Sequence, residues 1–344
     1  MSDQANRLKA ATHAVSKACT VCRDVQRELE RVQKITKDDR SPVTVADFAS
    51  QAIVAHELTE RLGPINLVAE EAADELRAQL ADGNDTVANA VLEAVRIAWP
   101  EATMDEVLDA IDIGGGDPAT DTMHGFWTLD PIDGTKGFLR GGQYAVALAW
   151  VENGSPQVGA LGCPNLSKDF SRPLDDPDPT GTIYLAIAAE GLAEIAANDP
   201  DGDPLPIKRL ELAEDEPLRM CESVESAHTS HSSSAKIMET MGRESASVRL
   251  DSQCKYAVVA RGQADIYLRM PTRPGYVERI WDHAAGAIMA TESGCAVTDV
   301  NGQTLDFSHG RGLEKNKGVV VAPTRIHGDL IKAIADLGLN VPVQ

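Results

Sequence analysis

Residues 126–138 read Phe-Trp-Thr-Leu-Asp-Pro-Ile-Asp-Gly-Thr-Lys-Gly-Phe, and this stretch is the most informative part of the chain. An apolar run leads to two carboxylates, Asp130 and Asp133, and Pro131 stiffens the link between them. The Gly-Thr-Lys-Gly that follows offers backbone N–H groups, a hydroxyl and an ammonium. Hard divalent cations prefer carboxylate oxygens, and backbone amides beside glycine can approach a phosphate closely. The stretch is therefore typical of a metal-dependent phosphatase.

A chain this rich in acid also produces acidic pairs by chance. Asp and Glu number 53 of 344 residues, and Asp38, Asp112 and Asp121 stand among other acidic clusters. The spacing of Asp130 and Asp133 alone would therefore fit a solvated turn. A surface turn, however, has no need of an apolar lead-in, a proline and a Gly-Thr in that order, so the full string favours a functional site.

The stretch resembles the signature of the inositol monophosphatase superfamily of metal-dependent, lithium-sensitive phosphatases. Its Lys-Gly-Phe end looks like the branch that hydrolyses 3′(2′),5′-bisphosphate nucleotides. Further matching segments follow the family order and extend the resemblance over most of the chain, at residues 41–47, 68–71, 251–256 and 280–286. The resemblance implies a layered αβαβα sandwich of the α+β or α/β class, like other sugar phosphatases, with the active site between its two halves.

Length and composition fit a large globular protein. Of the 344 residues 43% are hydrophobic but only 4% are aromatic, so aliphatic side chains must fill the core. The sequence has no run of 18 apolar residues, so no membrane span is expected. The six scattered cysteines indicate reduced thiols and a cytoplasmic protein. Cys19 and Cys22 are better explained as small helix thiols than as a metal or redox pair.

The net charge of −21 is more than a cluster of metal-binding carboxylates can explain. An acidic surface of this kind disfavours nucleic acid and anionic membranes as partners. An anionic substrate must then be met by bound cations and by local lysine and arginine. A salt-rich habitat or simply a soluble acidic surface would account for the remaining charge.

The apolar pattern divides the chain into two parts. The first part is predicted to hold helices over 3–34 and about 46–62, a strand over 66–69, one or two helices with a glycine-rich loop over 73–122, and antiparallel strands over 144–152, 157–163 and 182–189. Beyond about residue 217, short strands alternate with helices. We therefore predict an N-terminal α+β domain over 1–216 with most metal ligands, and a C-terminal α/β domain over 217–344 with the nucleotide-binding residues.

The resemblance also implies a metal site. It assigns two or three Mg²⁺ ions to the side chains of Glu70, Asp130, Asp133 and Asp282 and to the carbonyl of Ile132. Bound Mg²⁺ can generate hydroxide, clamp phosphoryl oxygens and stabilise the leaving alkoxide. The residues themselves agree in part, because Glu70 ends a short apolar strand. Asp282 precedes a small-residue helix and could equally be only its N-cap.

The nucleophilic water needs a base or an orienting pair, and the resemblance gives this role to Asp47 and Thr135. Asp47 would polarise the threonine hydroxyl, although it could also be an acid in the first turn of a helix, favoured by the macrodipole. Glu71 is a weaker ligand candidate because the family pattern uses the first glutamate of the pair. The backbone N–H groups of Gly134 and Thr135 are expected to bind the scissile phosphate, near a helix start if one follows.

Substrate choice is a separate inference from the same resemblance. The segment around His228 and His231 is similar to the nucleoside-contacting segment of the branch, so His228 would pack on adenine unless both imidazoles lie on the surface. Ser252, Lys255 and Arg269 look like the group that binds the second, non-reacting phosphate. The alternative is that Lys255 and Arg269 are ordinary solvated cations.

These implications predict a Mg²⁺-dependent 3′(2′),5′-bisphosphate nucleotidase that converts adenosine 3′,5′-bisphosphate to AMP and phosphate. The sulfated analogue and inositol 1,4-bisphosphate are further expected substrates. The partner would be this small phosphorylated nucleotide, and the chain would be a monomer or a weak homodimer. Two alternatives stay open, an inositol phosphate phosphatase and a catalytically silent nucleotide-binding sensor. Degraded ligands would favour the sensor, yet every ligand residue and Thr135 are present.

Overall fold

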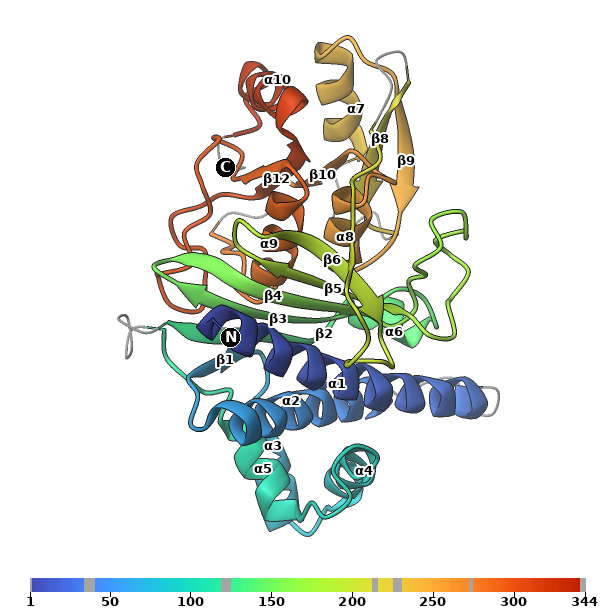
Figure 1. Cartoon of the computed structure of the whole chain (residues 1–344), viewed down its shortest axis with the longest axis vertical. Coiled ribbons are helices and arrows are strands. Elements are labelled where there is room, and N and C mark those ends of the chain that lie inside the picture. Colours follow the sequence, from blue (N-terminus) through green and yellow to red (C-terminus); the bar gives the residue numbers. More distant parts are fainter. Residues whose placement is uncertain are drawn as a thin grey trace.

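The computed structural model describes residues 2–33, 41–118, 125–211, 216–224, 231–271 and 275–340. Within them, helices and two sheets alternate in five layers along the long axis of the molecule (Figure 1). The order is helices, a seven-stranded sheet, helices, a five-stranded sheet and again helices. The expected αβαβα sandwich is therefore confirmed.

In the outer layer at one end, α1 (Asp3–Gln33) and α2 (Ser41–Leu62) pack against each other and against one face of the larger sheet. The prediction for α1 is confirmed almost to the residue. The prediction that α2 begins near Ala46 is wrong, since the helix starts at Ser41. This shift moves Asp47 from the first turn into the body of the helix.

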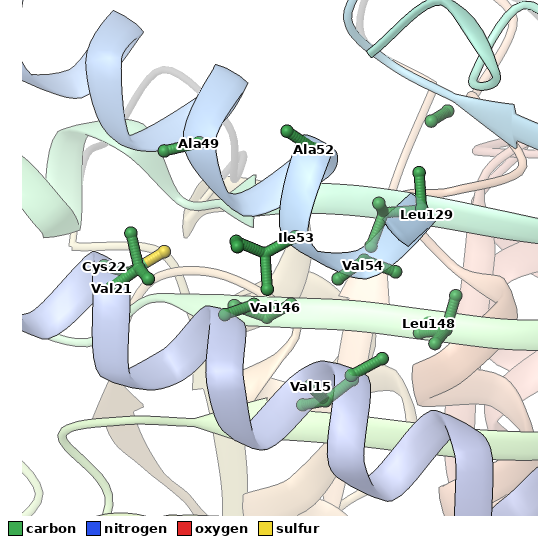
Figure 2. Packing of buried hydrophobic residues seen from close by; sticks show 14 of the residues in the cluster. Val15, Val21, Cys22, Ala49, Ala52, Ile53, Val54, Leu129, Val146 and Leu148 are labelled. Carbon is green, nitrogen blue, oxygen red and sulfur yellow. The ribbon is translucent and has the colours of Figure 1, made fainter. Parts of the chain in front are cut away.

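Aliphatic side chains and alanines form the core between these helices and the sheet. In Figure 2, Val15 of α1 and Ile53 of α2 lie beside Val146 and Leu148 of the sheet, and all four are fully buried. Each such side chain contributes about 1.5–3 kcal/mol through removal from water. Cys19 and Cys22 are both free and buried on α1, and the interpretation of the pair as small helix thiols stays a prediction.

The larger sheet has the strand order β1-β2-β3-β4-β5-β6-β7. Only β1 (Leu67–Ala69) and β2 (Phe126–Asp133) pair in parallel, and every later pair is antiparallel. The remaining strands are β3 (Ala145–Glu152), β4 (Ser155–Cys163), β5 (Thr182–Ile187), β6 (Gly191–Ala196) and β7 (Leu205–Pro206). The parallel pair places the end of β1 beside the end of β2, so Glu70 comes close to the aspartates of the 126–138 stretch.

Three helices, rather than the expected one or two, lie in the described part of the segment between β1 and β2. They are α3 (Asp74–Ala81), α4 (Thr86–Val95) and α5 (Met104–Asp112). The start of α5 has a capping box, in which the Thr103 N–H donates to the Glu106 carboxylate and the Glu106 N–H donates to the Thr103 hydroxyl. This Thr-x-x-Glu pattern was the sequence signal for the third helix.

The central layer lies between the two sheets and consists of α8 (Cys254–Ala260) and α9 (Ala284–Glu292) (Figure 1). α9 is buried along almost its whole length, which explains its small residues. A Cβ at Gly286 would lie 2.2 Å from the Tyr256 ring, so only glycine permits the observed approach of α9 to α8.

The smaller sheet has the strand order β11-β12-β10-β8-β9, and α7 (His231–Thr240) and α10 (Thr324–Asp336) cover its outer face. Its strands are β8 (Leu218–Glu222), β9 (Ser245–Arg249), β10 (Ile266–Arg269), β11 (Cys295–Thr298) and β12 (Val319–Pro323). The division into domains at residue 216 stays a prediction. None of the helices in the described ranges combines the length and the apolar character needed to cross a bilayer.

Candidate active site

The last residues of β2 leave regular pairing and form one wall of a cavity. Asp130 pairs with Ala147 of β3, but the next paired residue is Asp133, opposite Ala145, so the register slips between the two aspartates. Gly134 then adopts a left-handed conformation (φ 88°) and α6 (Thr135–Leu139) begins directly after it. The helix start expected after Gly134 is therefore present.

The cavity has a volume of about 360 Å³ and receives residues from both sheets. It is lined by Glu70, Asp130, Ile132, Asp133, Gly134, Thr135, Lys136, Gly137, Ser223, Asp251, Ser252, Lys255, Arg269 and Asp282. Most of the predicted site residues are in this set. Asp47 is not among them, and His228 and the side chain of His231 lie outside the described residues.

A larger cavity, of about 510 Å³, opens near Gly125 at the opposite end of β2. Asp306 is the only charged residue among its described lining residues. Since a phosphatase needs several charged groups in one place, we assign the chemistry to the smaller cavity, in which carboxylates and cationic side chains meet.

Asp130 is the most deeply placed carboxylate of the site. It is 2% exposed, and its Oδ1 has no hydrogen-bond partner among the described residues. Burial raises the pKa of Asp130 well above its usual range, and the like charges of Asp133, Glu70 and Asp282 raise it further. A buried carboxylate oxygen without a partner is costly, so this arrangement fits a group that binds a cation.

Glu70 and Asp282 share this electrostatic environment. Desolvation, followed by the charges of Glu71 and Asp133, raises the pKa of Glu70 to about 7. Burial raises the pKa of Asp282 to about 7 as well, with Asp133 as the main like charge. The donor set of four clustered carboxylates therefore suits hard divalent cations.

Asp282 does not cap a helix. α9 begins at Ala284 with His283 at the N-cap position, and neither Asp282 nor His283 makes a capping hydrogen bond through its side chain. Asp282 instead lines the cavity opposite the 126–138 stretch. The alternative that Asp282 is only an N-cap is therefore wrong.

Asp47 lies deep on α2, next to the glutamate pair. Burial, and then the charges of Glu71 and Glu70, raise its pKa well above the usual range. Its alternative role as a first-turn acid is wrong, because the helix begins six residues earlier, at Ser41. One turn further on, the Ser50 hydroxyl donates to the Pro131 carbonyl (2.8 Å) and fixes α2 against the turn between the two aspartates. The hydrogen bonds described for α2 and α6 do not include one between Asp47 and Thr135, so their pairing stays a prediction.

The loop before α8 completes the cavity from the other half of the molecule. Ser252 has a positive φ of 68°, which is unusual for a residue with a side chain. Its hydroxyl accepts a hydrogen bond from the Cys254 N–H (3.1 Å), and this contact begins α8. A Cβ at Gly134 would lie 2.7 Å from the Ser252 Cβ, so the two segments are in close contact.

Gln253 is a site residue to which sequence reasoning gave no role. Its backbone N–H donates to the Asp133 carboxylate, and its side chain donates to the Trp281 carbonyl (2.9 Å) and accepts from the Gly286 N–H (3.0 Å). It thus connects Asp133 to the segment that carries Asp282. The sequence signal that could have identified Gln253 is its place as a polar residue in the matched segment 251–256, directly before the apolar helix α8.

Arg311 makes a second connection between the halves. Its guanidinium donates to the carbonyl of Ala69, the residue before Glu70. The same group lies 4.8 Å from the centre of the Trp281 ring, and Trp281 directly precedes Asp282. Arg311 therefore contacts the backbone beside one ligand candidate and the ring beside another, and no pattern in the sequence indicated this.

The cationic side chains gather on the wall formed by the second half. Lys255 is 6% exposed and lies 5.4 Å from the Tyr267 ring, so the alternative that it is a solvated surface cation is wrong. Burial lowers the pKa of Lys255, whereas the charge of Asp133 raises it. Arg269 also lines the cavity and is half-buried, with Nε 2.7 Å from Glu278 Oε2 and Nη2 3.7 Å from Asp282 Oδ2.

Glu278, Asp282 and His283 form a cluster whose ligand atoms lie within 4.8 Å of one another. Glu278 Oε2, however, already meets Arg269 and His283 Nε2 (3.2 Å), and His283 Nδ1 lies 2.8 Å from the Tyr256 hydroxyl. A neutral imidazole satisfies both contacts by accepting from the tyrosine and donating to the glutamate. We therefore interpret Glu278 and His283 as a hydrogen-bond network behind Asp282 rather than as a metal site.

The chain is similar to known proteins over most of its length. Residues 3–338 match the model of the inositol monophosphatase family. The chain belongs to the inositol monophosphatase family. It is 39% identical to a 3′(2′),5′-bisphosphate nucleotidase of Schizosaccharomyces pombe, over 88% of this chain and 86% of that protein. It is 40% identical to a protein of the same description in Emericella nidulans, over 87% and 89% of the two chains.

Solved structures of this family share the fold. An inositol monophosphatase from Anabaena superposes with a TM-score of 0.61 and 19% identity, covering 97% of both chains. CysQ from Bacteroides thetaiotaomicron, described as a bacterial member of the inositol monophosphatase family, gives 0.58 and 18%, covering 94% and 98%. At 19% and 18% identity, these two structures show that the chain shares their fold.

Gly137, in the 126–138 stretch, lies so close to its neighbours that even a methyl side chain would clash with them. A Cβ at Gly137 would lie 2.1 Å from the Gln143 carbonyl oxygen and 3.1 Å from the Asp251 Cβ. We expect Gly137→Ala to lower the free energy of unfolding by about 1–3 kcal/mol, as overpacking in a close-packed region does. Gly142→Ala is the matched control, because its Cβ would approach only the Gly137 carbonyl, at 3.4 Å. Urea unfolding of both variants measures the effect, and equal stabilities would contradict this close contact.

Proposed function

We propose that this member of the inositol monophosphatase family is a 3′(2′),5′-bisphosphate nucleotidase, a phosphoric monoester hydrolase that converts adenosine 3′,5′-bisphosphate to AMP and phosphate. One observation carries the proposal: the same cavity joins a carboxylate cluster to a second wall with Ser252, Lys255 and Arg269. A cavity of this kind suits a substrate with two phosphates. The descriptions of relatives at 39% and 40% identity support it.

The carboxylates Glu70, Asp130, Asp133 and Asp282, with the Ile132 carbonyl, would hold Mg²⁺, on which the family generally depends. Their clustering and the unpartnered Asp130 Oδ1 fit such a group. Bound Mg²⁺ supplies activation of water and neutralisation of phosphoryl charge, in a reaction whose barrier must fall by on the order of 20 kcal/mol. We propose two or three ions, as the resemblance implies.

The other residues of the site position the reactants. Thr135, the first residue of α6, would hold the attacking water through its hydroxyl, and Asp47 would polarise that hydroxyl, so that the proton leaving the water passes to the threonine as the threonine proton passes to Asp47. The backbone N–H groups of Gly134 and Thr135 would bind the scissile phosphate. Ser252, Lys255 and Arg269 would bind the non-reacting phosphate through a hydroxyl, an ammonium and a guanidinium.

Several finer points belong to the same proposal. His228 would pack on the adenine, and the sulfated analogue and inositol 1,4-bisphosphate would be further substrates. The acidic surface, with a net charge of −21, supports a small-molecule partner rather than nucleic acid. Reduced cysteines support a cytoplasmic location, and a monomer or weak homodimer is the proposed assembly.

The test of the function is a comparison of substrates. Phosphate release is measured with adenosine 3′,5′-bisphosphate, inositol 1-phosphate and fructose 1,6-bisphosphate under saturating Mg²⁺. We expect kcat/KM to be highest for the nucleotide. A preference for inositol 1-phosphate would instead identify an inositol phosphate phosphatase, and binding without turnover would identify a sensor.

Lys255→Ala should separate substrates rather than disable the enzyme. A charge-assisted hydrogen bond is worth about 1.5–3 kcal/mol, so kcat/KM for the bisphosphate nucleotide should fall by roughly 10- to 150-fold. Hydrolysis of a nucleoside 3′-monophosphate, which lacks the second anion, should change little. Lys332→Ala on the outer helix α10, where the lysine is exposed, is the control. Equal losses on both substrates would place Lys255 in folding or general electrostatics.

A further inference from the structure

The cavity wall contains one carboxylate that the proposed chemistry does not use. Asp251 lines the cavity directly before Ser252, and its side chain is 14% exposed. Its charge raises the pKa of Lys255, so the two groups interact. A bare carboxylate at this place would repel a phosphate bound by Ser252 and Lys255, because like charges in a partly desolvated cavity interact strongly.

Arg140 pairs with this carboxylate from the other half of the molecule. It lies at the C-cap of α6, and its Nη2 meets Asp251 Oδ2. The two segments lie close together beside this pair, since a Cβ at Gly137 would lie 3.1 Å from the Asp251 Cβ. The Arg140 side chain is 42% exposed, so this ion pair adds little to the stability of the fold. The importance of Arg140 is that its positive charge cancels the negative charge of Asp251.

We propose that Arg140 is a specificity-determining residue that neutralises Asp251. With Asp251 paired, the wall of Ser252, Lys255 and Arg269 presents a net positive charge to the second phosphate of the substrate. This inference rests on the proposed function, because it concerns the non-reacting phosphate. Arg140 acts through Asp251 and leaves the carboxylates of the metal site untouched.

The sign of the effect distinguishes this role from a structural one. Arg140→Ala removes the cation that is paired with Asp251, so KM for adenosine 3′,5′-bisphosphate should rise roughly tenfold while kcat stays nearly constant. For adenosine 3′-monophosphate, both constants should change by less than about twofold. Asp251→Asn removes the repulsive charge itself, so KM for the bisphosphate should stay equal or fall. In the double variant Arg140→Ala/Asp251→Asn, KM should return to near the wild-type value.

The control is an arginine of similar exposure with aspartate partners elsewhere. Arg77 is 40% exposed and pairs with Asp109 and Asp112 on the helical insertion before β2. Arg77→Ala should leave KM unchanged for both nucleotides. Thermal unfolding of every variant shows whether loss of the ion pair has disturbed the fold.

Each outcome decides between the roles. If Arg140→Ala and Asp251→Asn impair both substrates alike and the double variant does not recover, the pair only holds the two segments together and the inference is overturned. An unchanged KM in Arg140→Ala also overturns it. If the wild-type protein shows no preference for the bisphosphate over the monophosphate, the proposed function fails instead. The wild-type comparison therefore separates the two failures.

Discussion

Replacing Asp133 by asparagine is expected to abolish turnover while the fold stays intact. The substitution removes one negative charge from the proposed metal site, and charge neutralisation by a bound cation is worth several kcal/mol, so kcat should fall by roughly 10³-fold or more. The asparagine carbonyl can still accept the hydrogen bond that Asp133 receives from the Gln253 N–H. The negative charge of Asp133 raises the pKa of Asp130. Replacing Asp133 by asparagine therefore also relieves the repulsion between these carboxylates in the metal-free protein.

Two measurements check this expectation. Phosphate release at saturating Mg²⁺ gives kcat, and thermal unfolding in the presence of a chelator should give a Tm equal to or above that of the wild type. Asp203→Asn makes the same charge change at an exposed position between β6 and β7 and should leave kcat unchanged. A variant Asp133→Asn with near-wild-type kcat would remove Asp133 from the metal site.

Asp47→Asn should produce the second large loss, of roughly 10²- to 10⁴-fold in kcat, which is the contribution typical of general acid–base catalysis. Asparagine has nearly the same shape, so the buried site on α2 should keep its packing. If Asp47 acts through the Thr135 hydroxyl, the double variant Asp47→Asn/Thr135→Ala should be no slower than the slower single variant, because residues that act as a unit lose their effect together.

Glu71→Gln is the matched control for Asp47. Glu71 is the largest like charge acting on Asp47, but it does not line the cavity. Its neutralisation should therefore lower kcat by less than about tenfold. Multiplicative losses in the double variant would show that Asp47 and Thr135 act independently, and equal losses in Asp47→Asn and Glu71→Gln would reduce Asp47 to a general electrostatic role.

The sequence predicted which residues line the site, but it predicted few of the contacts that hold these residues in place. The 126–138 stretch and the later matched segments identified the carboxylates and Lys255 because metal and phosphate chemistry limits the residue types that can serve. The layered fold followed from the same resemblance. The three-helix insertion was underestimated, since short helices such as α3 carry a weak periodic signal and only the Thr103 capping box marked α5.

Long-range contacts had no comparable signal. Gln253 and Arg311 connect backbone groups to residues far away in the sequence, and a backbone carbonyl such as that of Ala69 has no identity that a sequence could reveal. The prediction that α2 begins near Ala46 is wrong, because the helix already includes residues 41–45. The positive φ of Ser252 is a property of the packed loop and not of serine.

The span of these contacts has a consequence for the order of folding. Asp133 and Gln253 are separated by 120 residues and Ala69 and Arg311 by 242, whereas α1 and α2 follow each other in the chain. Closing a long loop costs entropy before its contacts repay it, so the helical hairpin can form early and the cavity only when both sheets are in place. During refolding, the recovery of phosphatase activity should therefore lag behind the recovery of helical circular dichroism.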